Sequence, residues 1–182
     1  MTERLAIDGG RKACPSWPER HLFGKAEQRA VNRLFERCIR TGRAIGYDGP
    51  EETAYCEAFA EFLGGGYADA VSSGTSAVYV ALKAARIPAF SEVICSPVTD
   101  PGGVMPIPLA GCIPVPADVA PGTFSIDPDS VAERVTKRTS AIVVAHIAGL
   151  PADMAPIMRT ARRHKLVVIE DCAQAHGATY RG

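Results

Sequence analysis

The feature of the sequence that most constrains its fold is the alternation, from residue 70 onward, between short apolar runs and longer segments with helical periodicity. The apolar runs predict strands near Ala70 and over 93–95, 113–117, 141–145 and 166–170. The intervening segments predict helices over 75–86, over 152–165 and after Asp127, an N-cap residue followed by Pro128. Strands that alternate with helices form a mostly parallel α/β sheet with helices on both faces, a doubly wound fold.

Upstream of residue 70 the sequence predicts an irregular start and two helices. Residues 1–25 form an irregular lead-in, and helices follow over 26–41 and 51–63. The side chains expected to face a core are Val31, Leu34, Phe35 and Cys38 in the first helix and Tyr55, Phe59, Phe62 and Leu63 in the second. Four prolines between 97 and 108 argue against a regular helix after Cys95. We therefore expect a lead-in over 1–25 and one large domain over 26–182.

Charge and cysteine content exclude several classes of protein. Twenty basic and twenty acidic side chains cancel, so nucleic acid and anionic membranes are not expected partners. The sequence has no apolar run long enough to span a bilayer and no signal-peptide core at its start, which favours a cytoplasmic protein. Six scattered cysteines without a C-x-x-C pair indicate reduced thiols. Cys172 and His176 are too few to form a metal site.

Two places in the predicted fold carry chemistry. Asp171 directly follows the last apolar run, and ligands of parallel sheets bind beyond the carboxyl ends of the strands. Gly74 lies in a turn before a helix, where free backbone N–H groups and the helix dipole attract anions. Each residue taken alone also has a purely structural interpretation: Asp171 as a strand-end cap, and Ser73 to Thr75 as an ordinary N-cap and turn.

Five segments strengthen the functional interpretation: residues 72–77, 92–94, 124–128, 146–154 and 168–178. In order and spacing they resemble the signatures of the DegT/StrS-type aminotransferases, which use pyridoxal 5'-phosphate (PLP) to aminate sugars and cyclitols. The resemblance covers nearly the whole chain and is most specific from Val71 onward. It implies the large domain of the aspartate aminotransferase-like fold, fold type I of the PLP enzymes, incomplete at its C-terminus.

The resemblance also implies roles for individual residues. Asp171 would pair with the ring nitrogen of PLP, Gln174 would contact the ring hydroxyl, and the backbone of Gly74 and Thr75 would hold the phosphate. Further candidates for lining the site are Ser73, Asp100, His146 and His176. His146 could equally serve in packing or in hydrogen bonding within a loop. Asp100 stands where many members of the family carry an aromatic residue that stacks on the ring.

The lysine that binds PLP covalently in this family would lie beyond Gly182. None of the lysines present fits that position; they are Lys12, Lys25, Lys83, Lys137 and Lys165. The resemblance therefore implies that residues 1–182 alone contain no catalytic residue, are inactive and expose an unpaired sheet edge that promotes association.

The function implied is PLP-dependent amino transfer from an amino acid, glutamate or glutamine, to a keto-sugar, often nucleotide-linked, or to a keto-cyclitol. Amino-sugar or secondary-metabolite biosynthesis and a homodimeric complete protein would follow. Two alternatives stay open: a PLP-dependent deoxysugar dehydratase of the same family, and a non-catalytic fragment or half-subunit. A Rossmann dehydrogenase is disfavoured because G-x-G-x-x-G follows none of the predicted strands.

Overall fold

The structure is a computed structural model that describes residues 4–12, 14, 19 and 22–182. The chain divides into two units, residues 1–49 and 50–182. The predicted domain boundary at residue 25 stays a prediction.

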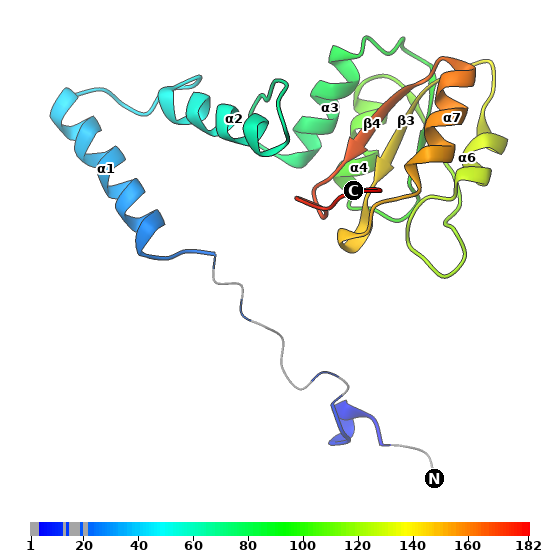
Figure 1. Cartoon of the computed structure of the whole chain (residues 1–182), viewed down its shortest axis with the longest axis horizontal. Helices are drawn as coiled ribbons and strands as arrows, with labels where there is room; N and C mark the ends of the chain where they lie inside the picture. Colours follow the sequence, from blue (N-terminus) through cyan, green and yellow to red (C-terminus); the bar gives the residue numbers. More distant parts are fainter. Residues whose placement is uncertain (1–3, 13, 15–18, 20–21) are drawn as a thin grey trace. The chain divides into compact units, whose positions relative to one another are not determined.

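The first unit contains a short 3-10 helix, η1 (Ala6–Asp8), and the helix α1 (Lys25–Thr41), as Figure 1 shows. The Glu27 carboxylate accepts the N–H of Gly24 at 2.6 Å, and Gly42 ends the helix with a left-handed φ of 67°. The helix predicted over 26–41 is confirmed. Its apolar stripe is not buried as expected, because no element described within residues 1–49 covers Val31 or Phe35.

The second unit is built on a sheet of four parallel strands in the order β2-β1-β3-β4. Figure 1 labels β3 and β4, which lie side by side. These strands are β1 (Glu92–Cys95), β2 (Ile113–Pro116), β3 (Thr139–Ala145) and β4 (Val167–Asp171), and they confirm four of the five predicted strands. The strand expected near Ala70 is wrong, because residues 67–71 make no ladder with any described strand. An apolar run becomes a strand only where a neighbour pairs with its backbone.

The other elements of the second unit are helices, several of which connect and cover the strands. They are α2 (Pro50–Phe62), α3 (Gly74–Ala84), α4 (Pro101–Val104), α5 (Pro106–Leu109), α6 (Pro128–Arg134), α7 (Met154–His164) and the 3-10 turn η2 (Ile147–Gly149). Among the described residues, no long regular helix directly follows Cys95, in line with the prediction. Pro101 and Pro106 each begin a helix of only four residues, at a position where the N–H that proline lacks is not needed. Asp127 caps α6 as predicted, accepting the N–H of Asp129 at 3.2 Å. The stripe of α2 is less buried than expected, and Tyr55 and Phe62 are exposed.

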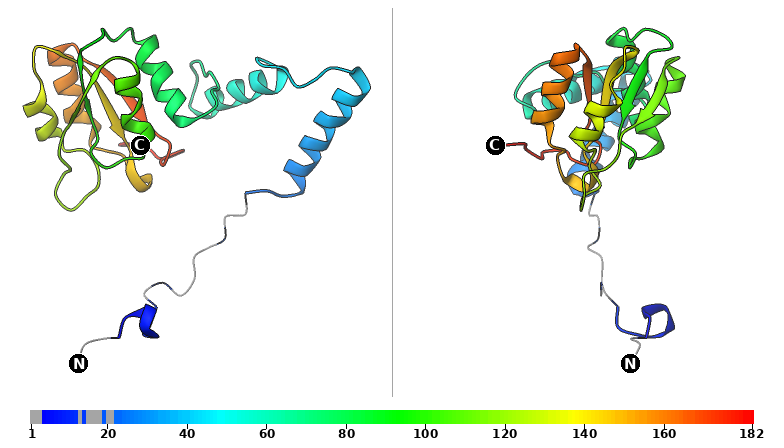
Figure 2. Two further views of the ribbon diagram at one scale, coloured as in Figure 1. Left: turned by 180° about the vertical axis from the view of Figure 1, so that it is seen from behind. Right: turned by 90° about the vertical axis from the view of Figure 1, so that its right-hand side faces the viewer.

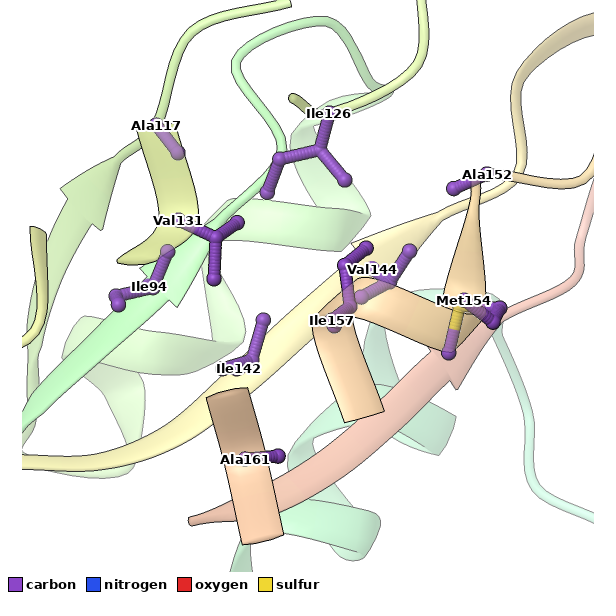
Figure 3. Packing of buried hydrophobic residues seen from close by; sticks show 10 residues of the cluster. All are labelled: Ile94, Ala117, Ile126, Val131, Ile142, Val144, Ala152, Met154, Ile157 and Ala161. Atoms are coloured by element: carbon purple, nitrogen blue, oxygen red, sulfur yellow. The ribbon is translucent and has the colours of Figure 1, made fainter. Parts of the chain in front are cut away.

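The two faces of the sheet bury separate apolar cores. Alternate residues point to opposite faces, so Ile94, Ile142 and Val144 pack with Val131 of α6 and Ile157 of α7 (Figure 3). On the other face Val93, Cys95, Ala141 and Val143 pack with Val78 and Leu82 of α3 and Ile107 of α5. Figure 2 shows these helices on either side of the strands. This arrangement fixes the strands rigidly and brings their carboxyl ends to one edge.

The strand register decides which residues meet at that edge. Ala145 of β3 lies beside Asp171 of β4, and the next N–H, that of His146, donates to the Asp171 carbonyl at 3.0 Å.

In the described part of the chain, no helix has both the length and the apolar character needed to cross a bilayer.

Candidate functional site

A pocket of about 350 Å³ lies at the carboxyl edge of the sheet. Its wall comes from the start of α3, the turn into α4, and the segments after β3 and β4. This volume is near the lower end of the range of ligand pockets, roughly 300–1,000 Å³. Of the sequence-predicted site residues, the pocket brings together Gly74, Thr75, Asp100, His146, Asp171 and Gln174.

The N-terminus of α3 contributes two unused hydrogen-bond donors. The Ser73 side chain caps the helix by accepting the Ser76 N–H at 3.0 Å. The N–H groups of Gly74 and Thr75, which come first in the helix, have no acceptor among the described residues. A Cβ added to Gly74 would meet no atom within 4 Å, so the space beside it is open. Together these features make the start of α3 a candidate seat for an anionic group.

Gly102 lets the α4 turn come close to this seat. A Cβ on Gly102 would lie 3.0 Å from Thr75 Oγ1 and 3.4 Å from Thr75 N, tighter than most side chains tolerate. Sequence reasoning missed this residue, although the adjacent Pro101-Gly102-Gly103 triplet signals a tight turn.

Asp171 ends β4 and is half-buried. Its Oδ1 accepts the Ala173 N–H at 3.1 Å, and its Oδ2 has no partner among the residues described. No lysine or arginine lines the described pocket, so Asp171 and Asp100 give it a negative character. The carboxylate therefore lies on a rigid strand end with one oxygen available to a cationic ligand group.

Gln174 joins two other parts of the pocket wall. Its Oε1 accepts the Ala148 N–H at 2.9 Å, and its Nε2 donates to Asp100 Oδ2 at 3.2 Å. Ala148 has a left-handed backbone, with φ 54°, within the η2 turn. No sequence signal points to Ala148, because alanine does not favour this conformation.

His146 is buried, and the protein engages both of its ring nitrogens. Nδ1 accepts the Ala152 N–H at 3.1 Å, so it carries no proton, and Nε2 lies 2.9 Å from Glu170 Oε2, to which it donates. This geometry favours the hydrogen-bonding interpretation of His146 over a free general base.

Ser73 and His176 do not line the pocket. Ser73 serves as the N-cap of α3, and the His176 ring packs edge-on against Phe59 of α2, with ring centroids 6.4 Å apart. Burial, followed by the charges of Glu170 and Asp171, raises the pKa of the nearby Cys172 thiol above 9.0. Residues 4–12, 14, 19 and 22–182 contain no cluster of three or more side chains that could hold a metal ion.

Sequence comparisons relate the chain to a family of aminotransferases. The family model described as the DegT/DnrJ/EryC1/StrS aminotransferase family matches residues 25–182. The chain is 38% identical to an L-glutamine:2-deoxy-scyllo-inosose aminotransferase of Streptomyces lividus, over 100% of this chain and 43% of that protein. It is 42% identical to a GDP-perosamine synthase of Caulobacter vibrioides, over 69% of this chain and 34% of that protein. The chain thus spans less than half the length of these curated relatives.

Solved structures show the same relationship. An aminotransferase from Psychrobacter cryohalolentis is 41% identical, with a TM-score of 0.81. The match covers 92% of this chain and 40% of the chain of that protein. NtdA from Bacillus subtilis, solved with bound cofactor PMP, is 31% identical with a TM-score of 0.80, covering 89% of this chain and 37% of its own. These likenesses confirm the predicted fold class.

Proposed function

The chain belongs to the DegT/DnrJ/EryC1/StrS aminotransferase family, and from this premise we propose that it forms the PLP-binding part of an aminotransferase. The observation that carries the proposal is the pocket itself. It combines the two unused N–H donors of Gly74 and Thr75 with the Asp171 carboxylate and the Gln174 amide. These groups match a ligand that has a phosphate at one end and a protonated ring nitrogen at the other.

In this proposal Gly74 and Thr75 hold the phosphate through their backbone N–H groups, and Gln174 donates to the ring hydroxyl. When bound, PLP supplies an electron sink for the bond broken at the Cα of the amino acid. Asp171 keeps the ring nitrogen protonated, because an adjacent anion favours the charged form of a base. Asp171 is held in place because it is the last residue of β4 and because its Oδ1 accepts the Ala173 N–H.

We propose amino transfer from L-glutamine to a keto-cyclitol, with a nucleotide-linked keto-sugar as the other possible acceptor. The relative named for L-glutamine and 2-deoxy-scyllo-inosose supports the first acceptor, and the GDP-perosamine synthase supports the second. These names favour amino transfer over the dehydratase alternative, because the dehydratases of similar structure are 24% identical and show the fold alone. Amino-sugar or antibiotic biosynthesis is the corresponding setting.

A cytoplasmic location and a homodimeric complete protein belong to the same proposal. No disulfide joins the described cysteines at positions 38, 56, 95, 112 and 172, which fits a reducing compartment. The exposed Val31, Phe35 and Ile39 on α1 support self-association, because an apolar stripe of this kind normally packs against another surface. Sedimentation of the complete protein would measure its oligomeric state.

The test of the function uses the complete protein loaded with PLP. L-glutamine and 2-deoxy-scyllo-inosose should yield an aminated cyclitol, detected by mass spectrometry. Asp171→Asn should lower the rate on the order of 10²–10³-fold, because an amide does not hold the ring nitrogen protonated. Asp129→Asn, on the exposed side of α6, is the matched control and should keep the parent rate. A near-normal rate for Asp171→Asn would remove Asp171 from its proposed role.

A further inference from the structure

The side chain of Gln174 is held between two groups from distant parts of the chain. The Ala148 N–H, in the turn after β3, donates to Oε1 at 2.9 Å. Asp100, in the turn that leads from β1 into α4, accepts from Nε2 at 3.2 Å. Gln174 itself follows β4, so one amide connects the segments after three strands at the pocket wall.

These two partners allow only one orientation of the amide. A backbone N–H can only donate, and an ionised carboxylate can only accept. Turning the amide over would place Nε2 against the Ala148 N–H and Oε1 against the Asp100 carboxylate, which sets donor against donor and acceptor against acceptor. Removing the acceptor at position 100 would leave the amide held by the Ala148 N–H alone, and Nε2 without a partner among the described residues.

We propose that Asp100 is a positioning residue that orients Gln174. Its carboxylate takes one hydrogen of Nε2, and the second hydrogen is thereby directed at the bound ligand. This inference rests on the proposed function, in which the ring oxygen of PLP accepts that hydrogen. Asp100 thus acts on the cofactor through Gln174 and not by touching it.

Two substitutions isolate the hydrogen bond from the charge. Asp100→Asn and Asp100→Leu both remove the negative charge and keep the branched shape of the side chain, but only asparagine retains an acceptor for Nε2. Asp100 is exposed, so both variants should unfold at the parent temperature. In the complete protein, Asp100→Leu should bind PLP more weakly than Asp100→Asn by about 2- to 10-fold, the effect of one ordinary hydrogen bond.

A second measurement reports on the ring oxygen directly. An N–H donated to that oxygen stabilises its ionised form. The pH midpoint of the change in the cofactor's visible absorption should therefore be higher in Asp100→Leu than in Asp100→Asn. With Gln174→Leu added to each variant, both differences should disappear, because Asp100 acts through Gln174.

The outcomes separate the inference from the proposed function. If the parent and Asp100→Asn bind PLP but Asp100→Leu matches Asp100→Asn in affinity and midpoint, the positioning role is overturned and the function stands. A difference between the variants that persists in the Gln174→Leu background would also overturn it. Failure of the parent protein to bind PLP would overturn the proposed function together with this inference.

Discussion

Gly74 lies at the proposed phosphate seat and has no side chain to obstruct it. It is the first residue of α3, its N–H has no acceptor among the described residues, and the space where a Cβ would project is open. A substitution at Gly74 should therefore weaken the binding of a ligand at this end of the helix and leave the fold unchanged.

Gly74→Val should weaken PLP binding on the order of tenfold or more, because the added methyl groups occupy the approach to the phosphate seat. Thr75→Ser, which leaves the backbone donors in place, should bind PLP nearly as the parent does. Titration of the complete protein, followed by absorbance, gives both dissociation constants, and thermal unfolding checks the fold. Normal binding by Gly74→Val would mean that the phosphate lies elsewhere.

Among the secondary structure elements, α3 serves two purposes. Its N-terminus faces the pocket, and one side of the helix anchors it to the sheet through Val78 and Leu82, which are 7% and 1% exposed. Val80 lies on the same helix but is 40% exposed. The position of the proposed anion seat therefore depends on packing that is one or more turns away.

Val78→Ala should lower the free energy of unfolding by about 1–2 kcal/mol, since each buried methyl group contributes roughly 0.8 kcal/mol and a small cavity remains. Val80→Ala changes the same residue type in the same helix, but at an exposed position. It should change the free energy of unfolding by less than about 0.5 kcal/mol. Urea denaturation of both variants compares them directly. Equal effects would show that α3 is not held by its inner face.

For the molecule as a whole, one ionic cluster connects the start of β1 to the loop before β3. The Glu92 side chain is 6% exposed, accepts from the Thr136 hydroxyl and pairs with Arg138, whose Nε donates at 2.9 Å. The hydrogen bonds from Thr136 and then Arg138 hold the pKa of Glu92 below its ordinary value of 4.5. This cluster lies at the edge of the sheet opposite the pocket.

Because the folded pKa of Glu92 is lowered, its contribution to stability is complete above pH 4.5 and is lost as the pH falls further, through the folded pKa. Glu92→Gln should therefore unfold at a lower temperature than the parent at pH 7, and the difference should shrink in acid. Thermal unfolding across pH measures this. Glu133→Gln, exposed on α6, is the control. A difference in unfolding temperature that stays the same at every pH would contradict the stabilising role of the ionised Glu92.

The five lysines in the sequence are all exposed, and none lines the described pocket. Borohydride reduction of residues 1–182 mixed with PLP should therefore give no stoichiometric adduct on one lysine, and peptide mass spectrometry would detect such an adduct. Stoichiometric labelling at one of these residues would show that a lysine of this segment reaches the cofactor.

The sequence by itself determined the α/β class, four of the strands, the helices over 26–41 and 51–63, and the Asp127 cap, because these depend on local periodicity and capping chemistry. It also placed Asp171 at the carboxyl edge of the sheet, since parallel strands end on the same side. Gly74 follows no described strand and reaches the pocket because α3 packs on the sheet. The roles of both residues toward PLP stay proposals.

Only the tertiary structure decided features that need a distant partner. Asp100 and Gln174 are 74 residues apart, and Gln174 also accepts from the N–H of Ala148, whose left-handed backbone alanine does not favour. Residues 67–71 form no strand because no described strand pairs with them. The stripes of α1 and α2 are less buried than their periodicity predicts, because burial depends on what packs against a helix. Local patterns set which elements can form, and pairing and packing decide which side chains meet.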